Sequence, residues 1–211
     1  MESLRPLRYF SSPSFVRTDL SAGTLRSQGG TRLLGISEDF LRGFVMACEH
    51  ETGPATVLIL HRCGQFYGAG LARRSEAELS AHLGKSLRDC SMNEFQILVE
   101  DLWNGYGLGQ LKTDWSCGQN GFLAIKLSHS PMQDIGPKGH LSDDMFAGVI
   151  EGFFCHFAGE GLTCIQTGDL RMGDREGTTF VLVPAESAQR VHGLISARVP
   201  HSKIVQQLQG D

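Results

Sequence analysis

The chain has 211 residues, of which 41% are hydrophobic and 20% are charged, which is enough apolar material for one globular domain with a core. Its formal net charge of −4 gives no general basic surface, so the composition argues against a nucleic-acid-binding protein. No segment reaches the roughly 18 apolar residues of a membrane helix or has the form of a secretory signal, and we therefore expect a cytosolic protein without a membrane span.

The N-terminal segment, residues 1–32, is rich in Ser, Gly, Pro and Arg, and this composition predicts an arm with little regular structure of its own. Its arginines outnumber its acidic residues. That excess suits contact with an acidic partner, or an arm that is solvated or packed on a dimer mate. We expect residues 33–200 to form a single domain and residues 201–211 to form a C-terminal tail.

Two helices are predicted after the arm. The first begins with Ser37 as its N-cap, and Phe40 and Phe44 contribute to one apolar face. The second is predicted within residues 53–74, because Pro54 suits the first turn of a helix and Leu60, Cys63, Tyr67 and Leu71 share one face. Residues 55–60 (ATVLIL) taken alone are equally consistent with a buried strand.

A third helix is marked by a capping box. Ser91 and Glu94 have the required spacing, and Gly105 or Gly107 is expected to end the helix. A β-hairpin should follow, with its turn at Asn120-Gly121.

The last third of the chain is predicted to contain a helix capped by Ser142, a hairpin with a turn at Gly173-Asp174, and a final helix from about Glu186 to Ala197. Helices, a hairpin, a helix, a second hairpin and a closing helix in this order predict an α+β fold. Its core would be an antiparallel sheet of about four strands packed with helices.

Two glycine pairs occur at helical spacing. Gly64 and Gly68 predict that another helix packs closely on the second helix, while Gly148 and Gly152 leave room for a neighbouring element or a ligand. Aromatic residues crowd the helix that carries Gly148 and Gly152 and also flank the first predicted hairpin, and they suit either a pocket for a flat apolar molecule or an ordinary core. These are Phe146, Phe153, Phe154, Phe157, Trp103, Tyr106 and Trp115.

No known catalytic motif is present. The glycines of GYGLGQL (residues 105–111) follow a predicted helix and not a strand, which argues against a dinucleotide-binding loop. Cys63 near His61, and Cys155 beside His156, leave Cys/His nucleophilic chemistry open, but adjacent helical residues point about 100° apart. The cysteines form no CxxC pair and are interpreted as reduced, mostly buried thiols.

A single histidine is enough to ligate a haem or chlorin. His129 on a predicted strand and His156 on the Phe-rich helix are the candidates for such an axial ligand. A hydrogen-bonded core or surface histidine is the more common alternative.

The segment from Asp143 to Leu182 resembles the vinyl-4-reductase domain family. Gly148, Gly152 and Gly159 take the family's helix glycines, and Gly173-Asp174 matches its turn. Members include a protein linked to bacteriochlorophyll synthesis, cyanobacterial relatives tied to photosystem assembly, and sensor modules of aromatic-responsive transcription activators. The resemblance implies a fold shared with TRAPP-type trafficking subunits.

The sequence departs from the family at the zinc-binding positions of its sensor members. Asp143 or Asp144, Gln166, Asp169 and Gly177 stand there. Gln166 is a poor zinc ligand and Gly177 has no side chain, so we expect no zinc and interpret the hairpin as a structural wall of a pocket or dimer.

The resemblance implies a non-catalytic small-ligand-binding domain, of unknown cofactor, that holds a tetrapyrrole or another flat apolar molecule. It further implies a homodimer acting in chlorophyll metabolism or photosystem assembly, in the cytoplasm or peripheral to photosynthetic membranes. A vinyl reductase of chlorophyll biosynthesis and a ligand-free dimeric scaffold are the alternatives. The predicted ligand contacts are Ile125, Leu127, His129, Phe146, Ile150, Phe153 and His156.

Overall fold

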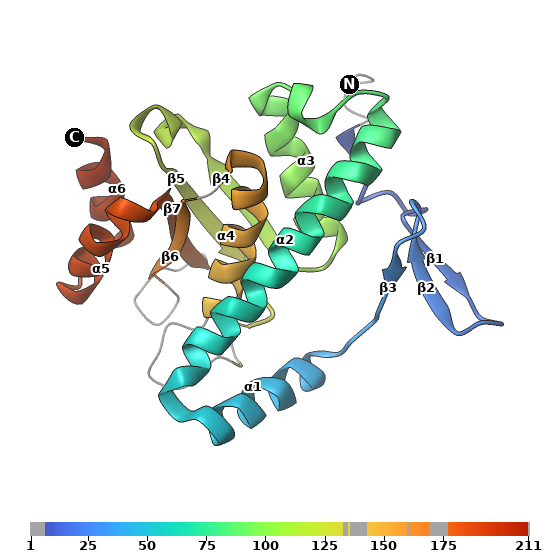
Figure 1. The fold of residues 1–211 in the computed structure, drawn as a ribbon, viewed down its shortest axis with the longest axis horizontal. Helices are drawn as coiled ribbons and strands as arrows, with labels where there is room; N and C mark the ends of the chain where they lie inside the picture. The colour runs from blue at the N-terminus through green and yellow to red at the C-terminus, as the bar shows by residue number, and fades with distance from the viewer. Residues whose placement is uncertain (1–6, 133–134, 136–142, 160, 169–176, 211) are drawn as a thin grey trace.

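The computed structural model describes residues 7–132, 135, 143–159, 161–168 and 177–210. Its main sheet contains β4 (Gln110–Asp114), β5 (Leu123–Ser128), β6 (Leu162–Gly168) and β7 (Thr178–Pro184). The strands are antiparallel throughout, in the order β4-β5-β7-β6. Helices pack on this sheet (Figure 1), so the predicted α+β class with an antiparallel sheet of four strands is confirmed.

The N-terminal segment has more structure than its composition predicts. It forms a small antiparallel sheet of β1 (Val16–Asp19), β2 (Thr24–Ser27) and β3 (Arg32–Leu33), which projects from the body of the molecule in Figure 1. Phe10 and Phe15 are buried in the main core, and the Asp101 carboxylate accepts a hydrogen bond of 2.7 Å from the Phe10 amide. The expectation of an arm with little structure is therefore wrong for the described part. Its strands have only two to four residues, too few for the alternation of a strand to show in the sequence.

The first two helices are α1 (Glu38–Thr52) and α2 (Thr56–Leu83). Ser37 is the N-cap of α1 as predicted, although its side chain makes no capping hydrogen bond. The predicted apolar face of α1 is wrong in part, because Phe40 is 61% exposed and Phe44 37% exposed, whereas Val45 is buried. Residues 56–60 are helical, so the alternative of a strand over residues 55–60 is also wrong. The helix continues to Leu83, beyond the predicted segment.

Two further helices complete the main core. In α3 (Met92–Gly105) both halves of the predicted Ser91–Glu94 capping box are present. The fourth helix, α4 (Asp144–Ala158), packs along α2 so closely that the two backbones touch at Gly64, Gly68, Gly148 and Gly152. The close packing predicted from Gly64 and Gly68 is confirmed. Within the described residues, no helix is both long and apolar enough to cross a membrane.

The first predicted hairpin is present as β4 and β5, but its connection is longer than a two-residue turn. A 3₁₀ helix, η4 (Trp115–Asn120), joins the strands, and Gly121 follows it with a φ of 78°. The second hairpin is present as β6 and β7, whereas its predicted turn at Gly173-Asp174 lies outside the described residues. The predicted cap Ser142 also lies outside them, and Asp143 occupies the N-cap position of α4.

The C-terminal residues form α5 (Ala188–Ser196) and α6 (His201–Gln209). These helices lie on the sheet face opposite to α4 (Figure 1), where they bury Val191, Ile204 and Leu208 against Val181 and other sheet residues. The predicted tail at 201–211 is therefore a packed helix over its described residues. It was missed because its buried residues, Ile204 and Leu208, are too few to establish a helical pattern.

Candidate functional site

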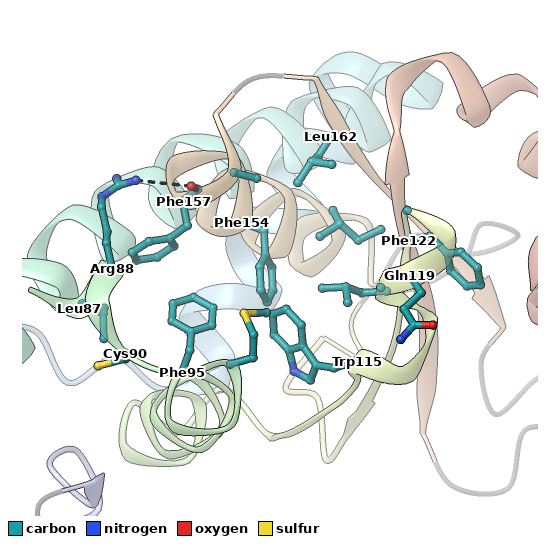
Figure 2. Close-up of a pocket in the computed structure, with 16 residues that line it drawn as sticks. Leu87, Arg88, Cys90, Phe95, Trp115, Gln119, Phe122, Phe154, Phe157 and Leu162 are labelled. Atoms are coloured by element: carbon teal, nitrogen blue, oxygen red, sulfur yellow. Dashed lines mark hydrogen bonds between the residues drawn. The ribbon is translucent and has the colours of Figure 1, made fainter.

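An apolar cavity of about 750 Å³ lies where α3, the C-terminal end of α4 and one end of the sheet strands meet. Figure 2 shows its side chains converging from these elements, from η4, and from the 3₁₀ turn η3 (Leu87–Asp89). The sheet contributes Leu123, Leu162 and Leu182. The cavity has a mostly hydrocarbon wall, which is typical of sites for small apolar molecules.

Aromatic rings from three elements form the centre of this wall. Phe95 of α3 meets Trp115 of η4 edge-on, with ring centroids 6.0 Å apart, and meets Phe157 of α4 at 5.0 Å. Phe154 lies 6.1 Å from Trp115. The indole N–H of Trp115 donates to the Thr113 hydroxyl at 2.8 Å, which holds the ring in its orientation. The rings thus present faces and edges to a flat molecule.

The Arg88 guanidinium at the rim is already paired. The Arg88 guanidinium donates to Glu76 at 2.7 Å and to the carbonyls of His156 and Phe157 at the end of α4, at 3.2 and 3.4 Å. One of these bonds is drawn in Figure 2. The Cζ atom of Arg88 also lies 5.6 Å from the centre of the Phe157 ring. Arg88 therefore holds η3 against α4, where the negative end of the helix dipole favours a cation.

Glu76 connects this rim to His156. Burial raises the pKa of Glu76, but the hydrogen bonds from His156 and Arg88 outweigh it and leave the pKa below its usual value. The His156 Nε2 atom lies 2.6 Å from the carboxylate. His156 is therefore bound to α2 through a charged carboxylate.

The thiols near the cavity are not activated for chemistry. Cys90 lines the cavity, and burial raises the pKa of its thiol. Burial also raises the pKa of Cys164 well above its usual value. Neither Cys90 nor Cys164 therefore has the lowered pKa that is typical of a nucleophilic cysteine. Neither histidine of the two Cys/His pairs considered above is left to act on its cysteine. His61, near Cys63, pairs with Glu151 at 3.2 Å, and His156, beside Cys155, pairs with Glu76. The Cys155 thiol donates to the Leu162 carbonyl at 3.6 Å.

The predicted ligand contacts lie elsewhere in the fold. Ile125, Leu127, Phe146, Ile150 and Phe153 are buried in the main core, and none of them lines this cavity. They fill the space between α4 and its neighbours. Phe153, for example, packs edge-on against Trp103 at 5.9 Å.

Neither predicted histidine is in the cavity wall that the described residues form. His156 pairs with Glu76, and His129 follows β5 with a φ of 58°. Sequence reasoning predicted ligand contacts on the face of α4 that carries Phe146 and Phe153. The cavity is lined instead by Phe154 and Phe157 of the same helix. Sequence reasoning did not identify Leu87 and Cys90, which lie in a short polar connection with no apolar pattern, or Met92, the first residue of α3.

Where the sensor members carry zinc ligands, this chain has a hydrogen-bonded cluster. The buried Asp143 carboxylate accepts hydrogen bonds from the Ser130 and Thr178 hydroxyls, and the Asp143 amide donates to Gln166 at 3.0 Å. A Cβ on Gly177 would lie 2.3 Å from the Leu127 carbonyl oxygen, so a ligating side chain does not fit there. Asp169, the remaining position, lies outside the described residues. The lack of zinc stays a prediction.

The fold is similar to that of a ligand sensor. The chain matches the phenol-responsive sensory domain of the transcription activator PoxR, solved with phenol, with a TM-score of 0.67 and 13% identity over 95% of this chain and 99% of that chain. A vinyl-4-reductase family protein from Methanocaldococcus jannaschii matches with a TM-score of 0.47 and 16% identity over 72% of this chain and 83% of that one. No protein-family model and no curated protein matches the sequence. The likeness to the sensory domain shows a shared fold.

Proposed function

We propose that this chain is a non-catalytic domain that binds a small, flat apolar molecule in the cavity between α3, α4 and the sheet. The observation that supports this most strongly is the aromatic wall formed by Phe95, Trp115, Phe154 and Phe157. The cavity volume of about 750 Å³ is within the range of small-molecule sites. A bound aromatic group that buries about 200 Å² would gain about 5 kcal/mol from the hydrophobic effect before the costs of association.

The chemistry of the wall favours a neutral ligand. Arg88 is engaged by Glu76 and by the carbonyls at the end of α4, and the Trp115 N–H is engaged by Thr113. These groups have their partners without a ligand. Selectivity therefore depends on shape and apolar area more than on charge, as expected for an aromatic hydrocarbon or a related compound.

A tetrapyrrole is the other ligand that the family resemblance implies, together with a role in chlorophyll metabolism or photosystem assembly. We favour the smaller aromatic molecule. His156 is held by Glu76, and His129 is not among the cavity-lining residues, so neither supports axial ligation in this cavity. The phenol-responsive sensor with the same fold is consistent with this choice.

Isothermal titration calorimetry with toluene and naphthalene tests the proposal. We expect saturable binding, weakened at least tenfold by Phe157→Ala, because the substitution removes one ring of the wall. Leu34→Ala is the control, because Leu34 is 77% exposed, is outside the cavity and belongs to neither α1 nor α2. The proposal would be contradicted if the protein did not bind these compounds, or if both substitutions weakened binding equally. Consumption of NADPH with a divinyl tetrapyrrole substrate would contradict the non-catalytic part of the proposal.

We also propose that the protein is a homodimer that associates through the exposed apolar residues of α1 and α2. Phe40, Met46, Leu58 and Phe66 are each more than 60% exposed. Exposed apolar residues of this size on adjoining helices are typical of an interaction surface. Light scattering after size exclusion should give a mass near twice the chain's 23.0 kDa, and Leu58→Ser with Phe66→Ser should give the monomer mass. A monomeric unsubstituted protein would contradict this proposal.

A further inference from the structure

We propose a second ligand site, for a small organic monocarboxylate with an apolar body, in a separate cavity of about 540 Å³. This cavity lies between the first half of α2, the first turns of α4, strand β6 and helix α5. It shares no lining residue with the aromatic cavity, which lies near the other end of α4. The proposal is therefore independent of the ligand proposed for the aromatic cavity, although Leu58 lines the second cavity and also belongs to the proposed dimer surface.

The first observation is an unmatched donor in the wall. Gln166 of β6 lines the cavity and is 4% exposed. Its Oε1 atom accepts a hydrogen bond of 3.0 Å from the Asp143 amide, which fixes the orientation of the side-chain amide. The Nε2 atom is then left buried with no hydrogen-bond partner in the structure. Leaving a buried donor unpaired is costly, and an acceptor atom of a ligand would remove that cost.

The buried carboxylate of Glu151 does not supply this acceptor. Burial raises the pKa of Glu151, but hydrogen bonds outweigh it and keep the pKa below its usual value. The carboxylate accepts from His61 Nε2 at 3.2 Å, from the Cys164 amide at 3.0 Å, and from the Gln65 side chain. Glu151 is therefore charged and occupied by donors from α2 and β6.

The charges around the cavity narrow the class of ligand. Arg62 of α2 and His192 of α5 line the cavity and are exposed, and the Arg62 guanidinium carries a permanent positive charge. Asp144, in the first turn of α4, places a negative charge on the same wall. The negative charges of Asp144 and Glu151 oppose a dianion such as phosphate, whereas a single carboxylate can pair with Arg62 and Gln166. Val57, Ile165 and Ile195 provide an apolar surface for the rest of the molecule.

Calorimetric titration of the full chain with benzoate tests the site. We expect one benzoate per chain, and at least tenfold weaker binding of benzyl alcohol, which has a similar shape without the charge. Arg62→Gln and Gln166→Met should each weaken benzoate binding five- to tenfold, because each removes one donor to the carboxylate. Arg42→Gln is the matched control, because Arg42 is exposed on α1 and does not line the cavity.

A competition experiment distinguishes ligand binding in the two cavities. Saturating toluene should leave benzoate binding unchanged, and Phe157→Ala should leave it unchanged as well. If toluene displaces benzoate, or if Arg62→Gln binds as tightly as Arg42→Gln, the second site is wrong. Absence of benzoate binding up to millimolar concentration would also overturn it. Because Arg62 is exposed, its substitution keeps the test valid even if Gln166→Met weakens folding through the lost Asp143 contact.

Discussion

Gly148 of α4 lies directly against the backbone carbonyl of His61 in α2: a Cβ atom on Gly148 would be 2.0 Å from that oxygen. The relationship is reciprocal, because a Cβ on Gly64 would be 2.0 Å from the carbonyl oxygen of Met145. Such distances are far inside van der Waals contact. The two helices therefore touch backbone to backbone, and their spacing depends on the missing side chains.

This contact predicts that Gly148→Ala destabilises the protein. The added methyl group would force α2 and α4 apart, which should lower the free energy of unfolding by about 2–3 kcal/mol. Urea unfolding followed by circular dichroism measures the change. Gly43→Ala is the matched control, because Gly43 is in α1 with nothing within 4 Å of an added Cβ. That variant should gain up to about 1 kcal/mol from helix propensity. Equal effects of the two substitutions would contradict the close contact.

Substitution by alanine should have opposite effects on stability at two serines of α2. Ser75 is 2% exposed and its hydroxyl has no hydrogen-bond partner in the structure, so Ser75→Ala should raise the free energy of unfolding by about 0.5–1 kcal/mol. The Ser80 hydroxyl accepts a hydrogen bond of 3.0 Å from the Leu87 amide, so Ser80→Ala should lower it by about 1 kcal/mol. Thermal and urea unfolding of both variants measure the difference. A loss of stability in Ser75→Ala would mean that its hydroxyl is paired in solution.

Glu151 predicts a dependence of stability on pH. Its pKa in the folded protein lies below the usual value despite burial, which raises it, because His61, the Cys164 amide and Gln65 donate to it. A carboxyl group of this kind stabilises the fold at pH values above its unfolded pKa, and the stabilisation is lost as the pH falls through the folded pKa. Glu151→Gln should therefore flatten the loss of stability below pH about 4.5 and cost about 2–4 kcal/mol at pH 7.

Urea unfolding between pH 3 and pH 7 measures this effect. Glu51→Gln on α1 is the control, because the Glu51 side chain is 76% exposed. If Glu151→Gln and Glu51→Gln give parallel curves, the buried carboxylate does not contribute to the acid sensitivity.

The hydrogen bonds of Asp101 should anchor the N-terminal segment to α3. Its carboxylate accepts hydrogen bonds from the Phe10 amide at 2.7 Å, from the Ser11 amide at 3.4 Å and from the Ser11 hydroxyl. Asp101→Asn should weaken this set, lower the free energy of unfolding by about 1–2 kcal/mol, and speed proteolysis before Leu33. Limited trypsin digestion followed by mass spectrometry measures the cleavage. Asp39→Asn, at an exposed position of α1, should digest like the unsubstituted protein.

The parts of the fold that the sequence predicts are those with strong local signals. The Ser91–Glu94 capping box locates α3, and Gly64 and Gly68 predict a closely packed helix, which the structure identifies as α4. The small N-terminal sheet and α6 have no comparable signal. Their few buried residues, such as Phe10 and Ile204, become core residues through contacts that are distant in the chain.

The candidate site is harder to predict for the same reason. The fold class and the abundance of phenylalanine on α4 suggest that a pocket exists, but its wall joins η3, α3, η4, α4 and three strands. Phe153 and Phe154 are adjacent in sequence and both are buried in the core, but only Phe154 also lines the cavity. Helical periodicity places both residues on an apolar side and does not separate these two roles.

The backbone contact between α2 and α4 also bears on how the proposed binding site can change over evolution. The four glycines leave α4 almost no freedom to shift, so the wall that carries Phe154 and Phe157 has a fixed position. The opposite wall, from Leu87 to Met92, is a short connection held to α4 by Arg88. Substitutions in that connection can widen or narrow the cavity without disturbing the helix pair. Related chains can therefore acquire different ligands through a few residues while keeping one scaffold.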